Sequence, residues 1–70
     1  MKPSIGRIVL FHGFDSNGSK EHPAIITRVW TDTCVNLSVF ADYGGLTLKS
    51  SAIQDEEMKQ DFGWRWPPRV

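Results

Sequence analysis

The chain has 70 residues, a single cysteine, and eight basic against eight acidic side chains, which gives a formal net charge of zero. This length predicts one domain, 1–70, with one core, and a single cysteine excludes an intramolecular disulfide. A neutral chain is not expected to hold long nucleic acid, and without a signal peptide or an apolar stretch of ~20 residues we expect a cytoplasmic protein that is not bound to a membrane.

Runs of β-forming residues separated by Gly, Pro, Asn and Asp predict an all-β fold. The first run is 5–11, and the polar stretch 15–21 that follows it is expected to be an exposed loop. The second run, 24–31, is entered through Pro23, a residue that a strand tolerates at its first position. A hairpin at 32–33 is expected to join it to the third run.

The third run, 34–40, has the clearest strand pattern. Its residues Val35, Leu37 and Val39 share one face, and polar residues share the other. This alternation with a period of two is typical of a strand with one dry and one wet side.

The second half of the chain contains two further strand candidates. Glycines in 42–45 permit the positive φ of a tight turn, which leads into the fourth run, 46–53. Residues 54–61 predict either one short helical turn near 55–60 or an acidic surface loop. Residues 62–70 form an extended aromatic and proline C-terminal tail.

Five elements joined by turns predict a small SH3-like barrel or a curled antiparallel meander of about five strands. A lone barrel has one dry interior, yet the first two runs carry apolar residues on both faces. In the second run Ile25 and Val29 lie opposite Ala24, Ile26 and Trp30. We therefore expect a homo-oligomer that covers part of the outside. Its expected interface residues are Trp30, Ile8 and Ile26.

Catalytic and metal-binding signals are weak. His12, His22 and Cys34 are the conventional base and nucleophile types of the sequence, and none belongs to a known catalytic motif. The two histidines flank the expected loop and could lie near each other, so a small hydrolase is a minor alternative. Their spacing fits no zinc framework, and we expect no metal and no cofactor.

Aromatic and basic side chains are more informative. A small β domain can hold a nucleotide by stacking a base between an aromatic ring and a guanidinium while another cation meets a phosphate. Such a small anionic ligand needs only a few local cations, which suits a neutral chain. The alternative for the tryptophans is a place in the core or in a subunit interface. The expected ligand-binding residues are Arg28, Lys49, Arg65, Arg69, Trp64, Trp66, Tyr43 and His12.

Segments 3–9, 22–30 with 35–40, and 63–69 together resemble a set of small proteins encoded by tailed bacteriophages and prophages. The specific part is the order Gly-Arg-Ile-Val, Pro-Ala-Ile-Ile-x-Arg-Val-Trp and Trp-x-Trp-Pro. The resemblance implies a phage origin, a small β fold and a place in the cytoplasm of the infected bacterium. By analogy of size and setting, small phage β proteins include sponges that sequester nucleotide signals of bacterial immunity, and others are virion components.

The leading hypothesis is a non-enzymatic phage protein that oligomerises and sequesters a cyclic oligonucleotide or a cyclic ADP-ribose signal between its subunits. Such a protein would act as an anti-defence sponge. The alternative is a structural or interaction module whose tail, Trp-Arg-Trp-Pro-Pro-Arg, docks on a phage or host partner.

Overall fold

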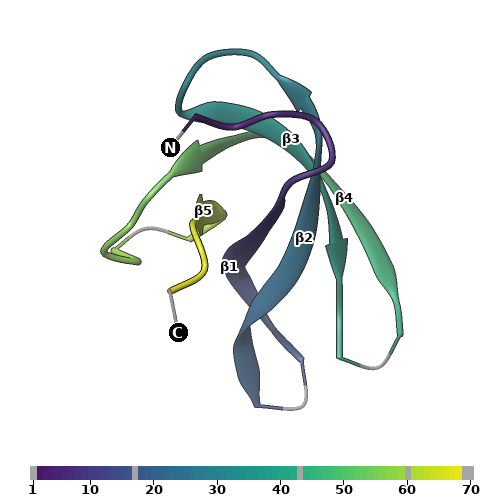
Figure 1. Ribbon diagram of the computed structural model, residues 1–70. Coiled ribbons are helices and arrows are strands. Elements are labelled where there is room, and N and C mark those ends of the chain that lie inside the picture. The colour runs from purple at the N-terminus through teal and green to yellow at the C-terminus, as the bar shows by residue number, and fades with distance from the viewer. Residues whose placement is uncertain (1, 17, 43, 60, 69–70) are drawn as a thin grey trace.

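The computed structural model describes residues 2–16, 18–42, 44–59 and 61–68, and of residues 14–16 the backbone alone. Five strands form a closed barrel in the order β1-β2-β3-β4-β5 (Figure 1). They are β1 (Ile8–Ser16), β2 (Ser19–Val29), β3 (Cys34–Phe40), β4 (Leu46–Gln54) and β5 (Gly63–Arg65). The protein is therefore all-β, as the sequence predicted, and it is consistent with a small SH3-like barrel.

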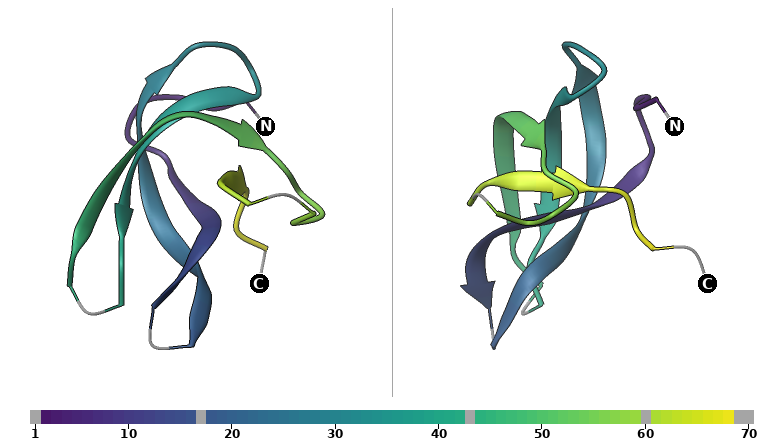
Figure 2. Two further views of the ribbon diagram at one scale, coloured as in Figure 1. Left: turned by 180° about the vertical axis from the view of Figure 1, so that it is seen from behind. Right: turned by 90° about the vertical axis from the view of Figure 1, so that its left-hand side faces the viewer.

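The barrel is closed by the short strand β5, which lies between β1 and β4 (Figure 2). β1 to β4 pair in succession as antiparallel neighbours, and β5 is antiparallel to β1. When an odd number of strands alternate in direction around a closed barrel, one pair of neighbouring strands must be parallel. Parallel neighbours need a crossover connection between them. Here that contact joins β5 to β4, at Ile53 with Gly63 and Gln54 with Trp64, and residues 55–62 make the crossover.

The first connection differs from the expected loop over 15–21. β1 and β2 continue as a paired hairpin, in which His12 lies opposite Glu21 and Ser16 opposite Ser19. The first strand also begins at Ile8 instead of residue 5, because a turn with Gly6 at φ 93° precedes it. Two residues between paired strands, Asn followed by Gly, form the strongest short hairpin signal, so the sequence favoured a hairpin here.

The other turns agree better with the sequence. At the expected second hairpin, the N–H groups of Trp30 and Thr31 both donate to Cys34 O, at 2.9 and 3.1 Å. At the third, Ala41 N–H donates to Gly45 O at 2.9 Å, and Gly44 has the expected positive φ, 92°. The segment after β4 is an acidic loop with turns, and the described residues contain no helix.

The core fills the barrel interior with side chains from all five strands. The face expected to be dry on β3 is dry, because Val35, Leu37 and Val39 are at most 1% exposed. Trp64, on β5, is fully buried and donates its indole N–H to Ala52 O and Thr33 O, both at 3.2 Å. The complete buried cluster is Val9, Phe11, Ala24, Ile26, Val35, Leu37, Val39, Ala52 and Trp64.

A bulge in β2 changes which side chains face inward. The register passes from Ile26 opposite Leu37 to Arg28 opposite Asn36, so Thr27 is an extra residue. Ile26 is fully buried, and its assignment to the subunit interface was therefore wrong. Beyond the bulge, Val29 packs against the core, although simple alternation placed it on the face opposite Ile26.

Gly13 permits the close approach of β1 to the crossover. A Cβ at this position would lie 2.6 Å from Phe62 N and 2.8 Å from Phe62 Cδ1. We predict that Gly13→Ala lowers the free energy of unfolding by about 1–3 kcal/mol more than Gly44→Ala, because overpacking adds to backbone strain. Gly44 is the control, since it also has positive φ but has nothing within 4 Å of its would-be Cβ. Urea unfolding followed by circular dichroism measures both, and equal losses would contradict the prediction.

Candidate functional site

The outer face of the barrel consists of the side chains on β1 to β4 that alternate with the core residues. Strand register and burial arrange them in four rows. The first row is Leu10, Pro23, Phe40 and Leu46, and the second is Ile8, Ile25, Ser38 and Leu48. The third row is Arg28, Asn36 and Ser51, and the fourth is Trp30, Cys34 and Ile53. A polar row thus lies between one apolar row on one side and two largely apolar rows on the other.

Much of the apolar surface on this outer face is open to solvent. The exposed fractions are Ile8 58%, Trp30 50%, Phe40 42%, Leu46 60%, Leu48 74% and Ile53 51%. Single exposed apolar residues are ordinary on protein surfaces, but several of them on neighbouring strands are typical of an interaction site. Two of the three residues expected at an interface, Ile8 and Trp30, belong to this set.

Asn36 organises the polar row. Its Oδ1 accepts hydrogen bonds from the indole Nε1 of Trp30, at 2.8 Å, and from the backbone N–H of Ser51, at 2.9 Å. Ser51 has a positive φ of 57° and lies where the pairing of β3 with β4 shifts register, opposite Asn36. Because one carboxamide oxygen holds both donors, the Trp30 ring has a fixed orientation although half of it is exposed.

Arg28 lies over the Trp30 ring, with its Cζ 4.0 Å from the ring centroid. The guanidinium is exposed and makes no ion pair with any residue that the structure describes. A guanidinium over an aromatic ring, with no ion pair of its own, keeps its donors available for a carboxylate or a phosphate. Arg28 and Trp30 therefore present a cation and an aromatic surface together.

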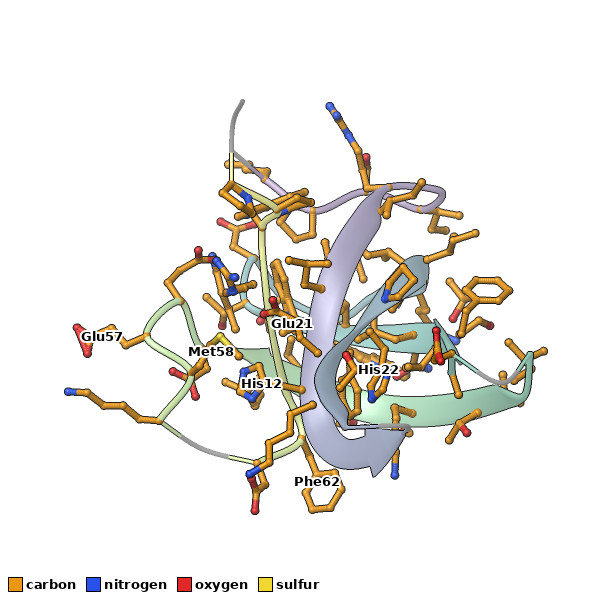
Figure 3. The ribbon with its side chains drawn as sticks, turned by 90° about the horizontal axis from the view of Figure 1, so that it is seen from below. His12, Glu21, His22, Glu57, Met58 and Phe62 are labelled. Carbon is orange, nitrogen blue, oxygen red and sulfur yellow. The ribbon has the colours of Figure 1, made fainter. Side chains whose placement is uncertain are left out.

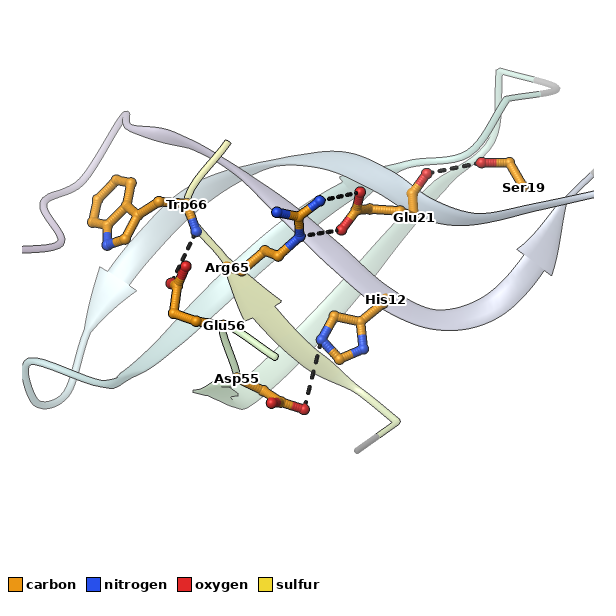
Figure 4. A network of polar contacts seen from close by, with 7 residues as sticks. All are labelled: His12, Ser19, Glu21, Asp55, Glu56, Arg65 and Trp66. Atoms are coloured by element: carbon orange, nitrogen blue, oxygen red, sulfur yellow. Dashed lines mark hydrogen bonds and ion pairs between the residues drawn. The ribbon is translucent and has the colours of Figure 1, made fainter. Parts of the chain in front are cut away.

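Arg65 has a different role. Its Nε and one terminal nitrogen donate to the two carboxylate oxygens of Glu21, at 2.6 and 2.9 Å (Figure 4). The hydrogen bond that Arg65 donates to Glu21 raises the pKa of Arg65 above its ordinary value. Arg65 is on β5, which lies on the other side of β1 from β2. The pair connects β5 to β2 beside Leu10, at the edge of the outer face. The Arg65 guanidinium, which the sequence analysis assigned to a phosphate, is therefore engaged by the Glu21 carboxylate.

The two histidines do not form a pair. His22 is 1% exposed and lies opposite Phe11, whereas His12 is 5% exposed and lies opposite Glu21, on the other side of the sheet. Seen from below, their rings lie on opposite sides of β1 (Figure 3). His12 Nε2 is buried without a hydrogen bond, 3.9 Å from Asp55 Oδ2. The ring is therefore packed beside the crossover and does not face a ligand on the surface.

The remaining expected ligand residues are dispersed. Trp64 was wrongly assigned to base stacking, because it is fully buried in the core. Trp66 is partly buried against that core and meets Trp64 edge to face, with ring centroids 5.4 Å apart. The Nζ of Lys49 lies 4.8 Å from the centroid of the Phe62 ring. Lys49 lies opposite Leu37, whose side chain points into the barrel, so the Lys49 side chain is on the inward side of β4 and away from Arg28. Tyr43 and Arg69 lie outside the described residues.

Other kinds of site find little support in the described part of the chain. No three His, Cys, Asp or Glu side chains there gather in a group that could hold a metal ion. Nor do those residues include a helix long and apolar enough to cross a membrane. Comparison of the chain with protein-family models, with curated proteins and with solved structures finds no match.

The Asn36 hydrogen bonds give a direct prediction. Asn36→Ala removes the acceptor of both Trp30 Nε1 and Ser51 N, so we expect a loss of about 1–2 kcal/mol in the free energy of unfolding and faster exchange of the Trp30 indole proton. Asn36→Asp keeps an acceptor oxygen and should retain the slow exchange. NMR of the indole N–H groups measures this, with Ser38→Ala as the control on the next outward position of β3. Unchanged exchange in Asn36→Ala would show that the hydrogen bond does not hold the ring.

Proposed function

We propose that the protein is a non-enzymatic binding module of phage origin that works as a homo-oligomer and associates through its outer face. The observation that carries this proposal is the set of six large apolar side chains, 42% to 74% exposed, on the outside of a barrel whose interior is already filled. A domain of 70 residues has a small core, and burial of a second apolar surface would add to its stability.

A second copy of the chain is the occupant that this outer face fits best. None of the acidic side chains of the chain lies in its four rows, and Arg28 is their one cation. The face therefore offers little charge complementarity to a strongly acidic or basic partner, whereas two copies of it can pack against each other around a twofold axis.

The finer part of the proposal is that the oligomer sequesters a small anionic nucleotide signal of bacterial immunity. Its support within the described residues is the stack of Arg28 on Trp30, which supplies a cation and an aromatic surface at one place. Arg65 does not contribute to this ligand as expected, because its Nε and one of its two terminal nitrogens already donate to Glu21.

Docking through the C-terminal tail has less support. Residues 63–65 of that tail form β5 and complete the barrel, and Trp66 donates its backbone N–H to Glu56 Oε2 at 3.1 Å. A segment that closes the fold is not available as a separate docking peptide. The hydrolase alternative also weakens, because the two histidines lie on opposite sides of β1.

Leu48→Lys tests the self-association. Leu48 is 74% exposed, so the substitution leaves the monomer folded, but a lysine covered by a second copy would lose its hydration. We expect the dissociation constant for self-association to rise at least about tenfold. Sedimentation velocity over a concentration series measures it.

The matched control is Met58→Lys, which places the same charge on another exposed apolar residue, in the crossover and outside the four rows. We expect this variant to associate like the parent protein. A parent protein that stays monomeric throughout the series, or two variants that weaken equally, would refute the proposed interface.

A further inference from the structure

We infer that Arg28 and Trp30 form an anion site that is completed when two copies meet, and that its ligand is a small aromatic phosphate such as a nucleotide. This inference rests on the proposed self-association through the outer face. It goes beyond that proposal by naming the two residues that hold the ligand and by making ligand binding and assembly depend on each other.

The first step concerns the charge of Arg28 after assembly. Arg28 lies between the row of Ile25 and the row of Trp30, so a second copy that covers these two rows on β2 and β3 also covers Arg28. A guanidinium removed from water without an anion costs several kcal/mol. The four rows contain no carboxylate, and in a twofold arrangement the second copy brings another Arg28 towards the same region. The four rows themselves therefore supply no anion to Arg28.

The second step identifies the kind of anion. The Cζ of Arg28 lies 4.0 Å from the centroid of the Trp30 ring, and a guanidinium with free donors binds a phosphate through two parallel hydrogen bonds. Trp30 is half exposed and is fixed by its 2.8 Å hydrogen bond to Asn36, so its ring can receive a base without first being ordered. A ligand with both a phosphate and a base uses both residues, whereas inorganic phosphate uses only Arg28.

One competitor for the ligand belongs to the chain itself. Asp32 is exposed in the hairpin between β2 and β3, next to the row that contains Trp30. In an assembled pair, the carboxylate of one copy could meet the Arg28 of the other and neutralise it. The experiment therefore includes Asp32→Asn.

The experiment measures self-association of the full chain by sedimentation velocity, alone and with a cyclic dinucleotide, AMP or inorganic phosphate. We expect the cyclic dinucleotide to tighten association about tenfold, AMP to act more weakly, and inorganic phosphate to have the smallest effect. Arg28→Gln keeps a planar side chain without the charge, so it should associate more tightly than the parent without ligand and lose the response to the nucleotide. Arg7→Gln, at an exposed arginine outside the four rows, is the control and should respond like the parent.

The outcomes separate this inference from the proposed function. Association that no nucleotide changes would overturn the anion site and leave the self-association intact, whereas a monomer under all conditions would overturn both. An equal response to phosphate and to nucleotides would overturn the role of Trp30. Weaker ligand-free association in Asp32→Asn would assign the anion to the second copy and overturn the nucleotide site.

Discussion

The burial of Trp64 is the interaction on which the rest of the structure depends. β5 has only three residues and shares two residue pairs with β4 and three with β1, so its backbone pairing alone would close the barrel weakly. The fully buried indole adds a large apolar contact, and its N–H reaches two carbonyl oxygens at 3.2 Å. The Arg65 to Glu21 pair then ties the same strand to β2 from outside. Closure therefore comes mainly from side chains.

Because the interior of the barrel is filled, the other large apolar side chains of β1 to β4 lie on its outside. Aliphatic side chains, Phe11 and Trp64 fill the barrel, and register shifts on both sides of β3 adjust which side chains point inward. The bulges converge on Asn36, whose oxygen satisfies the donors that the irregular pairing leaves on that side. Because the bulge at Thr27 brings Val29 inward, Trp30 and Arg28 remain outside and next to each other. The bulge at Thr27 thus completes the core with Val29 and leaves the Arg28 cation and the Trp30 ring exposed beside each other.

Most of the fold could be predicted from the sequence, but much of the site could not. Alternation in 34–40, β-forming runs and glycine turns were sufficient for the barrel, since these signals are local. The faces of β2 were misassigned because a bulge depends on the neighbouring strand, and so Ile26 was placed outside. Trp64 and Arg65 were assigned to a ligand because their partners, including Glu21, are distant in sequence. Residue type alone cannot show whether a tryptophan is buried or an arginine is neutralised.

The contrast between the two arginines explains how a neutral chain can have a specific cationic site. The charges of Arg65 and Glu21 cancel at the edge of the outer face. In the acidic crossover, Lys59 Nζ likewise pairs with Glu57 Oε2 at 2.8 Å. Arg28 has an aromatic ring as its neighbour instead of an acid, and a ring supports a cation without removing its charge. Among the described cations, Arg28 is thus one that is in no ion pair, and its place against an aromatic ring sets it apart. A site built in this way can attract a small anion while the protein as a whole does not attract long nucleic acid.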